Sequence, residues 1–321
     1  MRLLVTGGCG FIGSNFINYM FEKFPEIEIW NIDKCDYCSN EANIILRDSE
    51  KYHFIKGNIC SSDMIAYILK TAKIDTIVHF AAQSHVDNSF NNSLNHAQDN
   101  IIGTLTLLEE TRKYISSGEK FNIFIHISTD EVYGESEFSD EEGKIETSIL
   151  SPSNPYSASK AGAEMMVQAY LKSYKMPIII TRGNNVYGPR QYPEKLIPLF
   201  IKQLSQNKKC TVHGKGDSIR SFIYVEDTVS AISTILEKGV VGEIYNIGSD
   251  EEYSVLQVLQ KLVEILKNDQ NYEKYIEFTP DRNFNDKRYF VNSEKLSQLG
   301  WKKQTQFDDG IRKTIEWYQK N

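Results

Sequence analysis

Apolar positions along the chain follow two alternating patterns. Short, nearly continuous runs rich in β-branched residues are typical of strands buried on both faces of a sheet. We predict such strands at residues 3–6, 27–33, 53–59, 74–81, 122–128 and 177–182. Between them, apolar residues recur every three or four positions, most clearly at residues 11–24, 100–115 and 156–174, which predicts helices. Strands that alternate with helices indicate a parallel sheet covered on both sides.

The pattern changes after about residue 182. A helix near residues 194–205, short strands around Cys210 and Phe222, and helices at 255–267 and 307–319 are predicted there. We therefore expect an α/β protein in which a Rossmann-type doubly wound parallel sheet carries a smaller C-terminal α/β substrate domain. The expected division is 1–176 and 177–321, and the chain can return to the first sheet after residue 176.

The composition of the chain argues against nucleic-acid binding, membrane insertion and export. The 321 residues carry 43 acidic and 36 basic side chains, mixed along the chain, with a net charge of −7. This balance does not favour a nucleic acid or an anionic membrane as a partner. Because the first strand reaches glycines at residues 7 and 8, no signal peptide is expected, and no apolar run reaches the ~20 residues of a membrane span. We expect a cytoplasmic protein.

A glycine pattern follows the first predicted strand. Gly7, Gly10 and Gly13 stand where glycines let the backbone turn tightly and bring a pyrophosphate to the N-terminus of the next helix. Asp33 ends the second predicted strand, where a carboxylate accepts hydrogen bonds from ribose and repels a 2′-phosphate. The segment therefore predicts an NAD site rather than an NADP site, although the neighbouring Lys34 could soften that repulsion. The alternative is a glycine turn that binds nothing.

Tyr156 and Lys160 lie four residues apart, on one face of a predicted helix. A free tyrosine has a pKa of about 10, so a tyrosine that acts as a base near neutrality needs its pKa lowered by roughly three units. We expect Lys160 and the positive nicotinamide ring to lower it. A Tyr-x-x-x-Lys spacing alone is common; after a dinucleotide fingerprint it resembles the short-chain dehydrogenase/reductases.

Thr129, Asp130 and Glu131 directly follow the fifth predicted strand. The carboxyl end of a parallel strand faces the crevice where ligands bind. An acidic turn on the surface is the simpler interpretation of an Asp-Glu pair, but hydride transfer alone needs no additional carboxylates. Elimination needs two groups, one to remove a carbon-bound proton and one to protonate the departing hydroxyl.

These motifs resemble the nucleoside-diphosphate-glucose 4,6-dehydratases of the extended short-chain dehydrogenase/reductase superfamily, over nearly the whole chain. Five further segments carry the resemblance: HFAAQSHVD (79–87), RGNNVYGP (182–189), YPEKLIP (192–198), YNIG (245–248) and DR (281–282). The resemblance implies a hydro-lyase with NAD as a returning catalyst and no metal. It implies that Tyr156, helped by Thr129, takes the O4 proton, that Glu131 removes the C5 proton and that Asp130 protonates the C6 hydroxyl, while Lys160 holds the nicotinamide ribose.

The resemblance also implies two sets of binding residues. Those expected at NAD are Gly7, Gly10, Phe11, Ile12, Gly13, Asp33, Lys34, Asn58, Ile59, Phe80, Ala81, Ala82, Tyr156, Lys160 and Asn185. Those expected at the nucleotide-sugar substrate are Ser84, Thr129, Asn184, Lys195, Leu196, Ile197, Pro198, Arg220, Asn246, Arg282 and Asn285.

Several positions depart from the bacterial dTDP-glucose enzymes, which typically have Asp at Asn58, Glu at Gln83 and Pro-Gly-His at residues 283–285. Most of these differences, and the segments 36–40, 182–185 and 284–286, are similar to the UDP-glucose 4,6-dehydratase domain of plant-type UDP-rhamnose synthases. UDP-glucose is therefore the expected substrate, and dTDP-glucose the first alternative. A UDP-sugar 4-epimerase and a non-catalytic NAD-binding sensor are the others. The resemblance implies a homodimer formed through the helices at 100–115 and 156–174, and a downstream epimerase/reductase on another chain.

Overall fold

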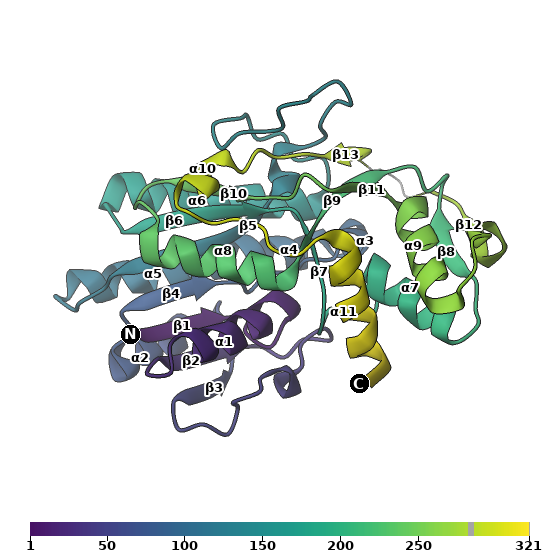
Figure 1. Ribbon diagram of the computed structural model, residues 1–321. Coiled ribbons are helices and arrows are strands. Elements are labelled where there is room, and N and C mark those ends of the chain that lie inside the picture. Colours follow the sequence, from purple (N-terminus) through teal and green to yellow (C-terminus); the bar gives the residue numbers. More distant parts are fainter. Residues whose placement is uncertain (282–285, 321) are drawn as a thin grey trace.

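Seven parallel strands form the larger sheet of the computed structural model, which describes residues 1–281 and 286–320 (Figure 1). In spatial order they are β10 (Ile244–Ile247), β6 (Ile178–Gly183), β5 (Ile123–Thr129), β4 (Thr76–His79), β1 (Arg2–Thr6), β2 (Glu28–Asp33) and β3 (Tyr52–Lys56). The chain first builds β1 to β3 in one direction and then returns to add β4 beside β1. This reversal is the switch point of a doubly wound sheet, where a ligand crevice forms outside the carboxyl ends of the strands.

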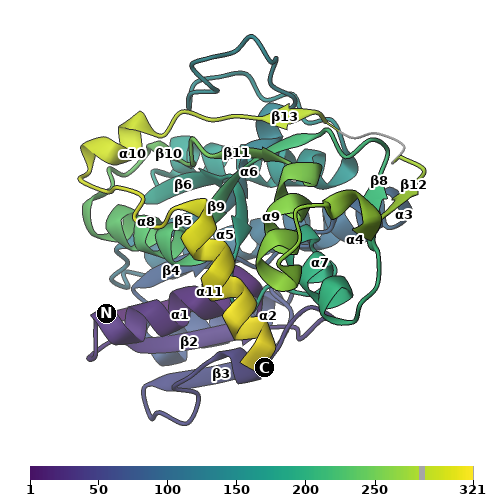
Figure 2. The same cartoon turned by 45° about the vertical axis from the view of Figure 1, so that its right-hand side comes forward.

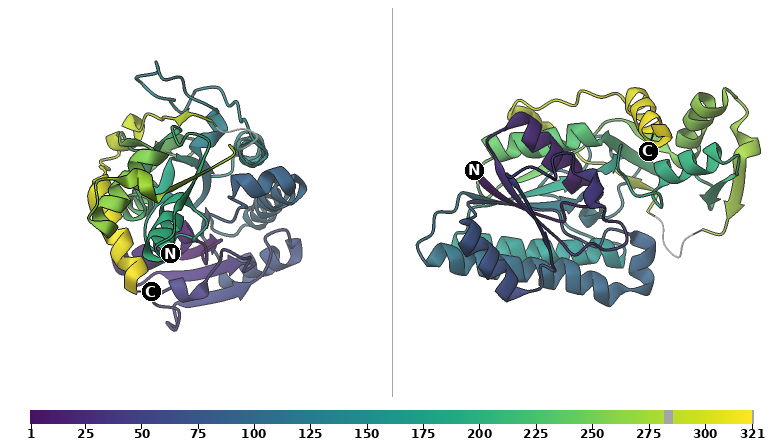
Figure 3. Two further views of the ribbon diagram at one scale, coloured as in Figure 1. Left: turned by 90° about the vertical axis from the view of Figure 1, so that its right-hand side faces the viewer. Right: turned by 90° about the horizontal axis from the view of Figure 1, so that it is seen from below.

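Helices cover both faces of this sheet (Figure 3). Along β1, Leu3 and Val5 enter one core while Leu4 enters the other, because successive side chains of a strand point to opposite faces. The first core is closed by α1 (Phe11–Lys23) and α8 (Val225–Lys238). The second is closed by α2 (Ser62–Ala72), α5 (Gly103–Ser116) and α6 (Pro155–Tyr174).

Short helical segments connect these elements. They are η1 (Glu41–Asn43), α3 (Val86–Asn91), α4 (Ser93–His96), the π-helix η2 (Ala97–Ile102), η3 (Asp130–Tyr133) and α10 (Glu294–Gln298). The π-helix runs directly into α5, so the helix predicted from residue 100 has a wider first turn than its spacing indicated. Within the described residues, no helix combines the length and the apolar character that a membrane span requires.

β6, β10 and α8, all after residue 176, belong to the large sheet and its covering helices, whereas two small sheets and their helices lie beyond the carboxyl ends of the large sheet (Figures 1 and 2). One small sheet contains β7 (Asn185–Tyr187), β9 (Ile219–Tyr224), β11 (Glu252–Ser254) and β13 (Arg288–Tyr289), and another pairs β8 (Cys210–His213) with β12 (Ile276–Thr279). Their helices are α7 (Leu196–Ser205), α9 (Val255–Lys267), η4 (Tyr272–Tyr275) and α11 (Phe307–Lys320). Phe200, Leu259 and Phe307 are buried in the core that these elements share.

The six strands predicted in the first 182 residues are all present, with ends displaced by up to three residues. The prediction of a parallel sheet is confirmed. Among the elements that were not predicted, β10 and α8 belong to the larger sheet and its covering helices. β10 is only four residues long and joins the large sheet beside β6, while α8 carries Val225, Val229 and Ile232 at helical spacing.

A buried ion pair joins α6 to β6. The guanidinium of Arg182 donates through Nε and Nη2 to Glu164 Oε1, at 2.8 and 2.5 Å. Its Nη1 donates to the hydroxyl of Tyr133, at 2.7 Å, and Ser128 Oγ donates to Glu164 Oε2 at 3.1 Å. Both charged side chains are at most 2% exposed. The pair therefore joins the end of β5, the segment η3 and the helix α6 at one point.

We predict that Arg182→Met lowers the free energy of unfolding by about 3–5 kcal/mol, because it leaves Glu164 buried without its counter-charge. Urea unfolding of the purified chain measures the loss. The double variant Arg182→Met/Glu164→Leu is the control and should recover a large part of it, since both charges are then gone. A loss below about 1 kcal/mol in the single variant would contradict this account.

Candidate active site

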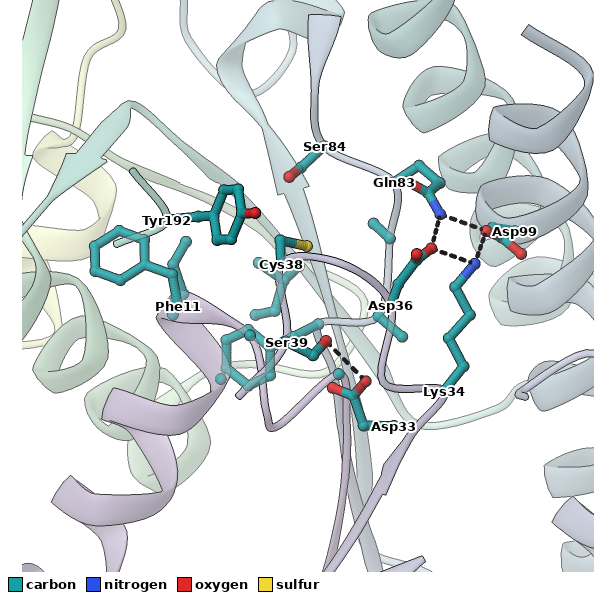
Figure 4. Close-up of a pocket in the computed structure, with 18 of the residues that line it drawn as sticks. Phe11, Asp33, Lys34, Asp36, Cys38, Ser39, Gln83, Ser84, Asp99 and Tyr192 are labelled. Carbon is teal, nitrogen blue, oxygen red and sulfur yellow. Dashed lines mark hydrogen bonds and ion pairs between the residues drawn. The ribbon is translucent and has the colours of Figure 1, made fainter. Parts of the chain in front are cut away.

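One cleft lies at the carboxyl edge of the large sheet and is lined by both parts of the chain. Figure 4 shows part of its wall, with residues from the end of β2 and the loop after it, the loop after β4, η2 and the segment before α7. Every residue predicted at NAD lines this cleft except Asn185, and so do Ser84 and Lys195 from the predicted substrate set. The structure thus brings together residues that the sequence separates by almost 190 positions.

The glycine segment lets neighbouring parts of the backbone come closer together than any side chain would permit. Gly7 has φ of +72°, and a Cβ built on it would lie 2.7 Å from backbone atoms of Ala81. A Cβ on Gly13 would lie 2.5 Å from the carbonyl oxygen of Gly7. The loop after β1, the start of α1 and the loop after β4 therefore pack backbone against backbone, as a pyrophosphate site at a helix N-terminus requires.

Asp33 is held at the end of β2 by three donors. The backbone amide of Cys9 lies 3.0 Å from Oδ2, while the amide of Cys35 and the hydroxyl of Ser39 lie 2.8 and 3.0 Å from Oδ1. The carboxylate is therefore fixed beside the glycine segment, in the cleft wall, where ribose hydroxyls bind in dinucleotide folds.

Asp130 and Glu131 begin η3, directly after β5. Asn184 Nδ2 donates to Asp130 Oδ2 at 2.7 Å, and Thr129 Oγ1 donates to Asp130 Oδ1 at 3.1 Å. Asn154 Nδ2 donates to Glu131 Oε2 at 3.2 Å. Because Asn154 also caps α6 by accepting from the amide of Ser157, it connects the acidic turn to the start of that helix.

Burial raises the pKa of both carboxyl groups. It raises that of Asp130 to about 6, against the hydrogen bonds from Asn184 and Thr129 that favour the ionised form. It raises that of Glu131 to about 7, and the negative charge of Asp130 raises it further. Between about pH 6 and 7 the pair therefore holds about one proton, and this proton lies mainly on Glu131, whose pKa is the higher. Such a pair can supply an acid and a base in the same site.

Tyr156 on α6 is close enough to this pair to be affected by both of its charges, and Lys160 stands one turn further along the helix. Both are buried, at 8% and 5% exposure, and the Tyr156 hydroxyl is hydrogen-bonded to Thr129. Lys160 Nζ donates to the backbone carbonyl of Ile127 at 2.6 Å. Burial lowers the pKa of Lys160 to about 8.

The pKa of Tyr156 shifts in the direction opposite to our expectation. Burial raises it, and so does the negative charge of Glu131, while the hydrogen bond with Thr129 lowers it. The expectation that Lys160 lowers it was wrong for the protein alone, since the ammonium is not among the groups that act on this phenol. Spacing on a helix shows that two side chains share a face, but it does not show how strongly burial opposes ionisation.

Several predicted substrate residues surround the acidic pair or lie near it. The charges of Arg220 and Lys195 lower the pKa of Glu131, and Lys195 Nζ donates to the carbonyl of Ser84 at 3.0 Å. Leu196, Ile197 and Pro198 form the first turn of α7. Arg282 and Asn285 lie outside the described residues.

Two predicted substrate residues have structural partners. The Asn184 amide donates to Asp130 and accepts from the backbone of Ser249 at 3.0 Å. Asn246 is fully buried; it accepts from Tyr133 and donates to the carbonyls of Lys144 and Asn292. Asn185, predicted at the nicotinamide, lies on β7, and its Oδ1 has no hydrogen-bond partner within the described residues.

Sequence reasoning missed part of the cleft wall. The additional polar residues there include Asp36, Ser39, Gln83, Asp99, Ser128, Gln191, Tyr192 and Glu194. Most of them stand in segments that carry the resemblance, and that position was the signal that could have indicated them. Asp99 and Gln191 stand outside those segments, and no local pattern indicated that they face the cleft.

Known proteins resemble this chain along its whole length. A family model described as GDP-mannose 4,6 dehydratase matches residues 4–314. The dTDP-D-glucose 4,6-dehydratase of Dictyostelium discoideum is 45% identical over 361 residues, which covers 100% of this chain and 82% of that protein.

A plant protein and a solved structure extend the comparison. The trifunctional UDP-glucose 4,6-dehydratase/UDP-4-keto-6-deoxy-D-glucose 3,5-epimerase/UDP-4-keto-L-rhamnose-reductase of Arabidopsis thaliana is 46% identical over 321 residues. The match covers 100% of this chain and 47% of the plant protein, so the chain spans about half its length. The crystal structure of the dTDP-glucose 4,6-dehydratase DesIV from Streptomyces venezuelae, with NAD and TYD bound, has a TM-score of 0.93 and 36% identity, covering 100% of this chain and 98% of that one.

We predict that the acidic pair takes up a proton as the pH falls through about 7 to 6, well above the usual range of carboxyl groups. Infrared difference spectra of the purified chain, recorded against the double variant Asp130→Asn/Glu131→Gln, measure the protonated carboxyl signal. In Asp130→Asn, Glu131 should titrate at a lower pH, because one negative charge that raises its pKa is removed. Titration of that variant at an unchanged or higher pH would contradict the coupling.

Proposed function

This chain belongs to the family described as GDP-mannose 4,6 dehydratase, among the nucleotide-sugar 4,6-dehydratases of the extended short-chain dehydrogenase/reductase superfamily, and from that premise we propose its reaction. We propose that it is an NAD-dependent hydro-lyase that converts UDP-D-glucose to UDP-4-keto-6-deoxy-D-glucose. The observation that carries the proposal is the buried Asp130–Glu131 pair beside Tyr156 and Lys160. A 4-epimerase or a non-catalytic NAD sensor has no use for two carboxyl groups that share a proton there.

The cleft residues fit NAD. Gly7, Gly10 and Gly13 leave room for a pyrophosphate against the N-terminus of α1, and Asp33 stands where it can accept from both ribose hydroxyls. Asn58 and Ile59 line the same cleft beyond Asp33, and Lys160 lines its other end beside β5. This order along the wall matches the adenine, ribose and nicotinamide ends of a dinucleotide.

Tyr156 acts on the sugar's O4 hydroxyl. Its phenolate takes the O4 proton, while Thr129, hydrogen-bonded to the same phenol, holds the oxygen in place. When bound, the cofactor would accept a hydride from C4 as NAD+ and return it to C6 as NADH, and the positive charge of NAD+ would favour the Tyr156 phenolate. Lys160 holds the ribose hydroxyls next to the reacting carbon.

The acidic pair carries out the loss of water. The C4 ketone makes the C5 proton acidic, and Glu131 in its ionised form removes that proton. Asp130 in its protonated form gives its proton to the C6 hydroxyl, so that the C6–O bond breaks and water leaves. In the protein alone the higher pKa belongs to Glu131, so this step requires the proton of the pair to lie on Asp130 when the substrate is bound. The sugar is then a conjugated enone, and a hydride added at C6 with a proton added at C5 completes the 6-deoxy product. Asn184 and Asn154 keep both carboxyl groups in position through these steps.

The diphosphate of the substrate needs cations near the acidic pair. Arg220 and Lys195 are close enough to affect the pKa of Glu131, and the N-terminus of α7 lies beside Lys195. We assign these groups to the sugar nucleotide, with Arg282 and Asn285 from the same prediction.

The choice of UDP-glucose rests on segments that resemble plant UDP-rhamnose synthases, namely residues 36–40, Asn58 and Gln83, and agrees with the plant relative. dTDP-glucose is the competing substrate, because the Dictyostelium relative and the Streptomyces structure carry that name. No described contact separates uracil from thymine.

We also propose a homodimer. Ile102 on η2 and Met165, Met166 and Tyr174 on α6 are 37–53% exposed on the helices that the resemblance places at a dimer interface. Burial of such side chains between two copies is the expected source of association.

We predict that the purified chain with UDP-glucose and catalytic NAD+ forms UDP-4-keto-6-deoxyglucose, which mass spectrometry detects as the loss of one water. The ratio of kcat/KM for UDP-glucose to that for dTDP-glucose should exceed about 10, a difference of roughly 1.4 kcal/mol in transition-state binding. A ratio below one would identify dTDP-glucose as the preferred substrate and contradict the choice of UDP-glucose. Conversion to UDP-galactose without loss of water would remove the dehydratase proposal.

We predict different defects for the two carboxyl groups. Glu131→Gln should reduce the entry of solvent deuterium at C5 at least about 100-fold, because the base is lost. Asp130→Asn is the matched control: it should keep C5 exchange but slow the loss of water by a similar factor. Both variants should bind NAD like the unmodified chain. Deuterium exchange at C5 that is retained in Glu131→Gln and lost in Asp130→Asn would show that Asp130 is the base and Glu131 the acid.

A further inference from the structure

Four polar side chains in the cleft wall form a closed set of contacts (Figure 4). Lys34 Nζ lies 2.9 Å from Asp36 Oδ2 and 2.5 Å from Asp99 Oδ2. Gln83 Nε2 donates to the same two oxygens, at 2.9 and 2.8 Å. Each carboxylate thus accepts from one cation and one amide, and the set joins three segments far apart in the sequence. We call it the Lys34 clamp.

The backbone around the clamp is fixed. The amide of Gln83 donates to Asn100 Oδ1 at 2.7 Å, and Asn100 Nδ2 donates back to the carbonyl of Gln83 at 3.0 Å. Asn100 is 1% exposed and lies, like Asp99, on the π-helix η2. Hydrogen bonds from Gln83 and Lys34 lower the pKa of Asp36 to about 2, so this carboxylate stays ionised at neutral pH.

Lys34 is the residue next to the ribose-facing Asp33, where a cation can receive the 2′-phosphate of NADP. A 2′-phosphate carries a charge of about −1.5 to −2 near neutrality. In the clamp, the ammonium already contacts two carboxylates. Together with Asp33 they place three negative charges and one positive charge along this wall, which repels a phosphate.

We propose that Asp36 and Asp99, bridged by Gln83, determine dinucleotide specificity by holding Lys34 in its ion pairs, so that the cleft selects NAD against NADP. The proposal rests on the proposed function, because it assumes that the cleft binds a dinucleotide. It assigns a task to three residues that lie outside the predicted cofactor set. It also explains why the charge of Lys34 need not weaken the repulsion between Asp33 and the 2′-phosphate of NADP.

Gln83 has a specific part in this arrangement. Its two amide protons are both used, one for each carboxylate. A glutamate in its place would offer no proton to either oxygen near neutrality and would add a third negative charge beside Asp36 and Asp99. The amide therefore allows two carboxylates to approach one cation from both sides.

The test compares the binding of NAD and NADP to the full chain by isothermal titration calorimetry at low and high salt. In Asp36→Asn/Asp99→Asn, the ratio of the Kd for NADP to the Kd for NAD should fall at least about 10-fold, because Lys34 becomes available to the phosphate. Each single variant should change it in the same direction by less. High salt should reduce the effect, since the clamp residues are partly exposed.

Two further variants distinguish an effect that requires Lys34 from one that follows simply from the loss of negative charge. Addition of Lys34→Met to the double variant should return the ratio to within about threefold of the unmodified chain. Lys56→Met is the matched control, because Lys56 is the register neighbour of Asp33 on β3 and is not among the described residues that line the cleft; it should leave the gain in place.

Three results would overturn the proposal. They are an unchanged ratio in the double variant and in both single variants, a gain that survives Lys34→Met, and a gain that Lys56→Met removes. Failure of the unmodified chain to bind NAD would contradict the proposed function and the proposal with it. NAD binding with an unchanged ratio would contradict the proposal alone.

Discussion

The carboxyl ends of parallel strands lie at one edge of a sheet, and every part of the site depends on that constraint. The carboxyl ends of β1, β2, β4 and β5 bring the glycine segment, Asp33, Ser84 and Ser128 to the same cleft although they are far apart in the sequence, and the acidic turn begins two residues after Ser128. The N-terminus of α6 reaches this edge as well, because Asn154 caps the helix and bonds to Glu131. The second part of the chain then closes the cleft from beyond the edge.

Burial at this edge changes the charges that the site carries. It raises the pKa of Asp130, Glu131 and Tyr156 and lowers that of Lys160, so each group moves toward its neutral form. For the carboxyl pair this shift is useful, since it keeps a proton within the pair near pH 7, although that proton has to lie on Asp130 for the proposed loss of water. For Tyr156 it opposes the reaction, and a positive charge brought by the cofactor has to reverse it.

The sequence predicted most of what depends on local pattern. Gly7, Gly13 and Asp33 stand in a short segment whose spacing indicates a strand, a turn and a helix, and Asn154-Pro155 marks the start of α6. The Lys34 clamp could not be predicted in this way, because Asp36, Gln83 and Asp99 meet only after β2, β4 and η2 are packed together. The same holds for Asn184, whose contact with Asp130 depends on β6 lying beside β5. The direction of the Tyr156 pKa shift was missed because burial is a property of the folded chain.

We infer that one site oxidises C4, removes water across C5 and C6, and reduces C6 with the same hydride. The direct test is the conversion of UDP-glucose labelled with deuterium at C4, followed by NMR and mass spectrometry of the product. We expect the deuterium at C6 of the 4-keto-6-deoxy product, with C5 carrying hydrogen from solvent. Deuterium that stays at C4 in a sugar that has lost no water would contradict it.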